Sequence, residues 1–227
     1  MRFVGLIRSS LIEYPPYIAH ITFVPGCIFR CDYCYNKEIV EDTSEENYTE
    51  KDLINMIKFD NKFSKFVKAL VISGGEPLLY QKELKPFVEE LKNLGLYVRI
   101  DTTAALKNED FLEILNGLSI TLKPISYYNA SQIRNLKENL KISQDLDYNY
   151  RELRITLTQE NYKEVLKTFD SIKNILDFEK WDFKIIKAKF IDENVHIGKF
   201  TLIEDKILEN IYQSFKNYPF KSITLQK

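Results

Sequence analysis

The three cysteines of the chain lie close together, within the stretch GCIFRCDYCYN (residues 26–36). Cys27, Cys31 and Cys34 have the spacing C-x3-C-x2-C, which allows three thiolates to bind one metal centre. Structural zinc sites usually have four Cys or His ligands in paired spacings, and neither histidine of the chain completes such a pattern. Iron–sulfur clusters are bound through Cys thiolates, and three ligands on a four-iron cluster leave one iron open. The spacing therefore favours a [4Fe–4S] cluster, with zinc binding or three unligated thiols as the alternatives.

A second stretch whose residues could bind a ligand is ISGGEPLL (residues 72–79). Gly74 and Gly75 have no side chains to hinder the close approach of a ligand to the backbone. The carboxylate of Glu76 can accept a hydrogen bond from an ammonium group. Such residues are common in turns, so this stretch alone does not indicate a binding site. Together with the cysteines it does, because each of the two stretches directly follows a β-rich segment.

The segments that must position these residues alternate between β-rich runs and helical patterns. The β-rich runs are residues 17–24, 69–73, 96–101, 118–123, 152–158 and 183–190. The helical patterns are residues 80–95, 108–117, 161–176 and 203–215, with one more that begins near Thr49. Repeated strand–helix units predict an α/β fold with a parallel sheet, and six units fit an open barrel or a doubly wound sheet.

Side chains alternate along a strand, so each predicted strand has two faces of different polarity. The side chains of the polar faces are Arg99, Asp101, Lys123, Arg154, Lys187 and Lys189. In the last strand, the same alternation assigns Ile185 to the polar face and Ile186 to the face covered by helices. Charged groups are costly to bury without partners. The polar faces should therefore contact water or a ligand, as in an open, cleft-like barrel.

The composition excludes several classes of protein. A net charge of −1 gives no overall attraction to nucleic acid or to an anionic membrane. The N-terminal sequence lacks the features of a signal peptide, and no apolar run is long enough to span a membrane. We expect a cytoplasmic protein with reduced thiols and with no nucleic-acid or membrane partner. We also expect a single domain over residues 1–227, with its core over about 17–190 and a C-terminal extension over 191–227.

Together, the two motifs resemble those of the radical S-adenosylmethionine (SAM) superfamily, including the aromatic residue before the last cysteine. The resemblance implies a partial (β/α)6 open barrel of the radical SAM type, with a [4Fe–4S] cluster on Cys27, Cys31 and Cys34 and with SAM on the open iron. The SAM contacts that it implies are Tyr33, Ser73, Gly74, Gly75, Glu76, Asp101, Thr102, Lys123 and Arg154. No catalytic residue beyond the cluster ligands is expected. Candidate substrate contacts are Lys187 and Lys189.

Within that superfamily, CDYCYNKE (residues 31–38) resembles the activating proteins of anaerobic (class III) ribonucleotide reductase. This resemblance implies reductive cleavage of SAM to a 5′-deoxyadenosyl radical, which installs a glycyl radical on the large reductase subunit. A donor such as flavodoxin or ferredoxin would supply the electron. Thr121 stands where these activases usually have an aspartate, which removes a ligand for a cation.

Two alternatives remain at this point. A radical SAM enzyme that acts on a small anionic molecule, such as a 7-carboxy-7-deazaguanine synthase, would use the basic side chains of the polar faces to bind a carboxylate. A protein without catalytic activity, which only binds an iron–sulfur cluster or zinc, would need the cysteines alone.

Overall fold

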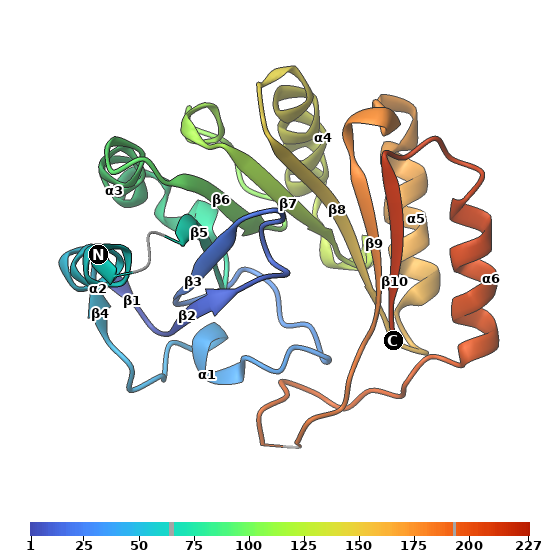
Figure 1. Cartoon of the computed structure of the whole chain (residues 1–227). Helices are drawn as coiled ribbons and strands as arrows, with labels where there is room; N and C mark the ends of the chain where they lie inside the picture. Colours follow the sequence, from blue (N-terminus) through green and yellow to red (C-terminus); the bar gives the residue numbers. More distant parts are fainter. Residues whose placement is uncertain (64–65, 193) are drawn as a thin grey trace.

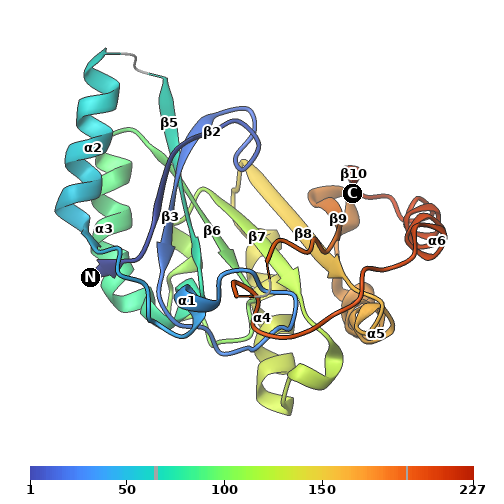
Figure 2. The same cartoon turned by 90° about the horizontal axis from the view of Figure 1, so that it is seen from below.

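One eight-stranded sheet carries the residues of interest (Figure 1). The computed structural model describes residues 1–63, 66–192 and 194–227. In sheet order, the strands are β10 (Ser222–Gln226), β9 (Asp182–Lys187), β8 (Tyr150–Leu157), β7 (Gly117–Leu122), β6 (Tyr97–Thr102), β5 (Val67–Gly74), β3 (Ile18–Val24) and β2 (Leu6–Ser10). All neighbouring strands are parallel except β2, which is antiparallel to β3. The carboxyl ends of the parallel strands therefore meet at one edge, toward which Figure 2 looks.

The main helices lie on the outer face of the curved sheet (Figures 1 and 2). They are α2 (Glu50–Phe63), α3 (Gln81–Asn93), α4 (Ala130–Asp145), α5 (Tyr162–Ile172) and α6 (Asp205–Phe215). A short helix, α1 (Lys37–Val40), follows the cysteines, and β1 (Arg2–Phe3) pairs with β4 (Tyr48–Thr49). In the described part of the chain, the edge strands β2 and β10 do not pair with each other, so the barrel is not closed. The predicted α/β fold of the partial-barrel type is confirmed.

The outer face of the central strands is apolar and fully buried against the helices. Leu118, Ile120 and Leu122 of β7 belong to the same core cluster as the side chains that alternate along β8. Burying each such side chain contributes about 1.5–3 kcal/mol relative to exposure. Burial of this apolar face therefore stabilises the packing of the helices against the sheet.

The prediction for β9 was wrong about which residues face the helices. Phe183 and Ile185 are buried in the core cluster, whereas Lys184 and Ile186 face the inside of the barrel. Two adjacent isoleucines make the alternation ambiguous, and the strand ends at Lys187 rather than at residue 190. Lys189, which lies beyond that point, therefore carries no information about the direction of the strand's side chains.

Several other segments differ from the predictions, among them α4 and β2, which no predicted segment covers. The pattern over residues 108–117 forms only a 3₁₀ turn at Leu112–Ile114, because β7 already begins at Gly117. The segment predicted to be a C-terminal extension contains α6 and β10, and β10 adds one more parallel strand beside β9. The sheet therefore has one more parallel strand than the six predicted.

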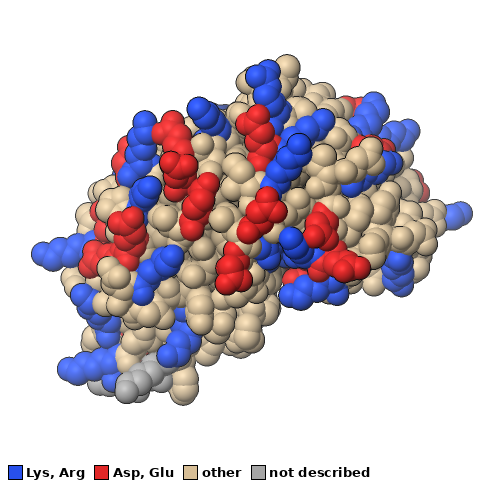
Figure 3. All heavy atoms as spheres, turned by 90° about the horizontal axis from the view of Figure 1, so that it is seen from above, with Lys and Arg blue, Asp and Glu red and all other residues tan. Residues whose placement is uncertain are grey.

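The distribution of surface charges is consistent with the small net charge of the chain. On the face shown in Figure 3, basic side chains alternate with acidic ones. Within residues 1–63, 66–192 and 194–227, no helix is both long enough and apolar enough to cross a bilayer.

Candidate functional site

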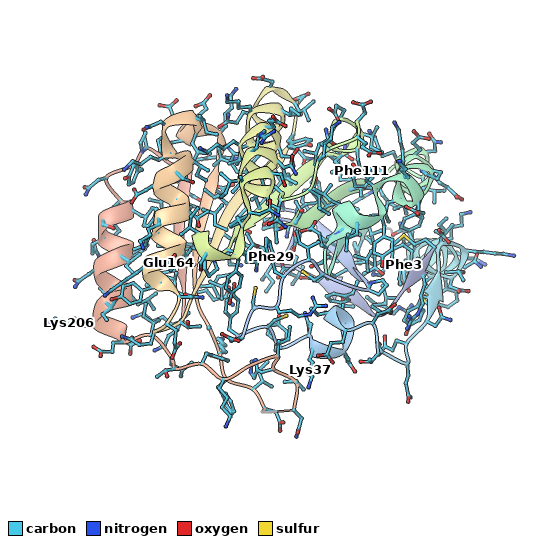
Figure 4. All side chains as sticks on the ribbon, turned by 180° about the vertical axis from the view of Figure 1, so that it is seen from behind. Phe3, Phe29, Lys37, Phe111, Glu164 and Lys206 are labelled. Atoms are coloured by element: carbon cyan, nitrogen blue, oxygen red, sulfur yellow. The ribbon has the colours of Figure 1, made fainter. Side chains whose placement is uncertain are left out.

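A cavity of about 490 Å³ lies inside the curve of the sheet, near the carboxyl ends of the parallel strands. One wall is the loop that follows β3, residues 26–36, here called the cysteine loop; Phe29 and Lys37 in Figure 4 mark its course. The other walls come from the ends of β5 and β7 and from the inner faces of β8 and β9. The fold therefore brings both sequence motifs to the same cavity.

The three thiols line this cavity together. Cys31 is buried, Cys27 and Cys34 are half-buried, and none forms a disulfide. Burial raises the pKa of Cys27 to about 11 and also raises the pKa of Cys34. Across the described residues, no three Cys, His, Asp or Glu side chains already surround a single metal position. Three thiols on one wall of a cavity are nonetheless a donor set that fits a [4Fe–4S] cluster, since such clusters take thiolate ligands.

The glycine motif packs directly against the start of the cysteine loop. The N–H of Gly75 donates to the carbonyl of Val24, and the N–H of Glu76 donates to the carbonyl of Gly26, both at 2.9 Å. A Cβ on Gly75 would overlap that Gly26 carbonyl. Gly74 has a φ of +110°, which a residue with a side chain rarely adopts. The backbone conformation at Gly74 and the close packing at Gly75 therefore require glycine at both positions, even without a bound ligand.

Glu76 is fully buried and is held by several donors. Its carboxylate accepts hydrogen bonds from the N–H of Leu78 at 3.1 Å and from the N–H of Thr103 at 2.9 Å. The hydroxyls of Thr102 and Thr103 also donate to it. Glu76 therefore ties the end of β6 to the end of β5. Its contact with SAM, like that of Thr102, stays a prediction.

Two arginines and three carboxylates form an ion-pair network inside the barrel. Arg99 pairs with Asp101 at 2.6 Å and with Glu13 at 3.3 Å. Arg154 pairs with Glu13 at 3.0 Å, with Asp101 at 3.1 Å and with Glu152. The sequence predicted a basic face that needs water or a ligand. Both arginines are instead neutralised within the protein: Glu13 comes from a loop, and Glu152 lies on the same face of β8 as Arg154 but was not counted with the polar face. Arg154 also lines the cavity.

We expect Arg99→Met to destabilise the fold strongly. Arg99 is completely buried, and its removal leaves Glu13 and Asp101 with fewer counter-charges. Breaking a buried pair by removing one partner typically costs about 3–5 kcal/mol. Urea unfolding measures the change, with Lys173→Met as the control, because that lysine forms an exposed pair with Asp170. Equal urea midpoints for the two variants would contradict the assignment of a structural role to the network.

The same network predicts a loss of stability in acid. Burial alone would raise the pKa of Asp101, but its pairs with Arg99 and Arg154 outweigh burial and hold the pKa below its usual range. The pKa of Glu152 is lowered in the same way, chiefly by Arg154. The unfolded chain therefore takes up protons first, and stability should fall as the pH drops below the ordinary carboxyl pKa of about 4. Unfolding followed from neutral to acidic pH tests this; Asp101→Asn should show a shallower loss, and an unchanged slope would contradict it.

The remaining predicted residues are placed as follows. Lys123 lines the cavity, and its ammonium lies 3.3 Å from the hydroxyl of Tyr33, which lines the same cavity. Lys187 also lines the cavity but pairs with Asp205 at 2.7 Å, and Lys189 lies at the exposed rim. Ser73 is half-buried at the end of β5 and is not part of the cavity wall.

Lys184 is a charged cavity residue that the sequence patterns missed. Lys184 of β9 lines the cavity between the neighbouring positions Arg154 of β8 and Thr224 of β10. A signal was present, because β8 and β9 are predicted neighbours and a cation at residue 184 continues the polar face of β8. Placing Lys187 and Lys189 on the polar face assigned Lys184 to the opposite, helix-facing side of the strand.

Comparisons with known proteins support a 4Fe-4S cluster domain. A family model described as a 4Fe-4S single cluster domain matches residues 18–147, which is more than half of the chain. A protein of Methanocaldococcus jannaschii named as a glycyl-radical enzyme activating enzyme is 33% identical over 98 residues, covering 43% of this chain and 38% of that protein. The pyruvate formate-lyase-activating enzyme of Staphylococcus epidermidis is 31% identical over 96 residues, covering 41% and 38%. The match thus spans well under half of either relative's length.

A solved structure supports the fold independently. A radical SAM methyltransferase from Sphaerobacter thermophilus superposes with a TM-score of 0.62 and 12% identity. The match covers 94% of this chain and 67% of that one. At this identity the likeness concerns the fold.

Proposed function

The chain belongs to the 4Fe-4S single cluster domain family, of the radical SAM type, and on that premise we propose that it is an activating enzyme for a glycyl-radical enzyme. The observation that carries the proposal is the cavity shared by three thiols and the glycine motif. The names of the two curated relatives support the choice of reaction. The partner that we propose is the large subunit of an anaerobic ribonucleotide reductase.

Each part of the cavity has a role in this proposal. Cys27, Cys31 and Cys34 would hold the cluster, and the backbone at Gly75 would face SAM. The cluster, when bound, supplies the electron that cleaves the sulfonium of SAM and so generates the 5′-deoxyadenosyl radical. Lys123 places a positive charge beside the thiolates, which favours their charged form.

The interior network contributes by filling part of the inside of the open barrel. Arg99 is fully buried, whereas Arg154 and Glu13 line the cavity itself. A cavity that is walled off in this way limits the access of water and of other quenchers to a reactive species. The protein itself then needs no acid–base pair, in keeping with hydrogen-atom abstraction from a backbone glycine.

The alternative of a small anionic substrate loses part of its support but keeps the cavity lysines Lys123, Lys184 and Lys189. Its basis was an unpaired basic face, and Arg99 and Arg154 are paired inside the protein. Lys187 is also paired, with Asp205. A partner protein that brings its own glycine segment needs no such cluster of free cations.

Anaerobic reconstitution of the full chain with iron and sulfide tests the proposal in two stages. After reduction with dithionite, the protein should convert SAM to 5′-deoxyadenosine; no product would exclude radical SAM chemistry. In the second stage, addition of a class III reductase large subunit should produce the electron paramagnetic resonance signal of a glycyl radical. A signal with pyruvate formate-lyase alone would reject the reductase, and a signal with neither partner would reject the activase proposal.

A further inference from the structure

The connection between β9 and α6 is unusually long for this kind of fold. It runs from the end of β9 at Lys187 to the start of α6 at Asp205, whereas such connections usually have about 2–6 residues. Long connections in compact domains commonly have a function. Residues 194–204 of this connection are here called the strap, and they lie outside the region matched by the family model.

The first half of the strap is hydrogen-bonded to the cysteine loop and its end. The N–H of Ile197 donates to the carbonyl of Cys34, and the N–H of Gly198 donates to the carbonyl of Asp32, both at 3.1 Å. The N–H of Lys37 donates to the carbonyl of Val195 at 3.2 Å. In both Figure 1 and Figure 2, this segment runs beside the loop that precedes α1. The backbone around the last cysteine is therefore fixed by residues far along the chain.

The second half of the strap is attached to the opposite side of the barrel. Leu202 forms a β-bridge with Thr158, directly after β8. The N–H of Gln159 donates to the carbonyl of Thr201 at 2.9 Å, and the N–H of Thr201 donates to the Glu160 carboxylate at 2.9 Å. The strap thus connects the loop after β3 with the loop after β8, across the edge where the cavity opens.

A buried histidine stiffens the strap between these two attachments. His196 is only 3% exposed, and its Nε2 accepts the N–H of Ile191 at 3.1 Å. Its ring packs against Phe190 and Phe200, with centroid distances of 5.5 and 5.0 Å. Ile191 and Ile197 then present apolar side chains to the cavity, next to the thiols.

We infer that the strap is a positioning element for the cluster. It holds the cysteine loop in the shape that binds iron and covers the cluster on the side of Cys34, which limits the access of water and chelators. Outer contacts of this kind typically change metal binding by about 10–100-fold when they are removed. The inference rests on the cluster site of the proposed function but does not depend on which partner the enzyme activates.

Two variants of the full chain test the inference by separate contacts. Ile197→Pro removes the N–H that donates to Cys34, and Gly198→Ala brings a Cβ against the carboxylate of Asp32. The readout is the rate at which reconstituted protein releases iron to a chelator, without SAM or partner. We expect release to be about 10-fold faster for both variants. Lys199→Ala, an exposed change within the strap, should release iron at the wild-type rate.

The outcomes distinguish positioning from a general loss of structure. Thermal unfolding of the cluster-free proteins shows whether each variant folds; if Ile197→Pro does not, Gly198→Ala decides. Adding Asp32→Ala to Gly198→Ala removes part of the overlap and should restore slow release. Wild-type release from folded Gly198→Ala would overturn the inference. If the wild-type chain fails to activate a partner while the variants still lose iron faster, only the proposed function is rejected.

Discussion

Gly75→Ala should deplete the protein of iron even though it leaves all three cysteines in place. The added Cβ would overlap the carbonyl of Gly26, immediately before Cys27, where the N–H of Glu76 also donates. Backbone on both sides prevents an easy displacement, so the first cysteine would be moved away from its position. We expect the iron bound per chain after anaerobic reconstitution to fall to roughly a tenth or less of the wild-type value.

Gly95→Ala is the matched control for this change. Gly95 has a φ of +79° after α3, and a Cβ there would meet no atom within 4 Å. The control should cost about 1 kcal/mol of folding stability through its backbone strain but should retain its iron. A full iron content in Gly75→Ala would show that the contact between the two motifs is not needed for cluster binding.

Serine in place of Cys27, Cys31 or Cys34 should remove the cluster and with it the conversion of SAM to 5′-deoxyadenosine. Each variant leaves at most two thiolates, and a serine oxygen is a much harder ligand than the sulfur that iron–sulfur clusters require. The loss should exceed the roughly 10–100-fold that follows removal of an outer contact. Iron, sulfide and zinc analysis of the reconstituted variants, with the product assay, measures it.

Thr156→Ala controls for a small change in the same cavity. Thr156 lines the cavity from β8 but offers no sulfur ligand, so this variant should bind iron as the wild type does. A cysteine variant that retains iron and sulfide at the wild-type level would refute its assignment as a ligand. Zinc in place of iron in the wild-type protein would instead favour a structural metal site.

Much of the fold follows from local patterns in the sequence. The strands β7 and β8 were predictable because Leu118 and Ile120, like Leu153 and Ile155, alternate with polar residues. In β9 the pattern fails, since Ile185 and Ile186 are equally apolar and only the packing of Ile185 in the core decides between them. Alternation therefore predicts a strand's orientation only where one of its faces is polar.

The site was predictable to the extent that its residues lie in short motifs. The cysteines and Gly74–Gly75 meet at one cavity because both motifs end parallel strands. Asp101 lies on the same face of β6 as Arg99, so this pair follows from the alternation, but the contact with Glu13 was not predictable, since Glu13 reaches Arg99 from a loop before β3. The contact between Ile197 and Cys34 joins irregular segments, which have no periodicity to reveal it.

The strap also has a consequence for the order in which the protein is made. A ribosome synthesises Cys27, Cys31 and Cys34 long before Ile197 and Gly198, the residues that hold the cysteine loop from outside. Domains assemble during or after synthesis, which proceeds at about 5–20 residues per second. The nascent chain therefore carries three uncovered thiols for several seconds. If the strap secures the cysteine loop as inferred, we expect iron and sulfide to be delivered to that loop after translation.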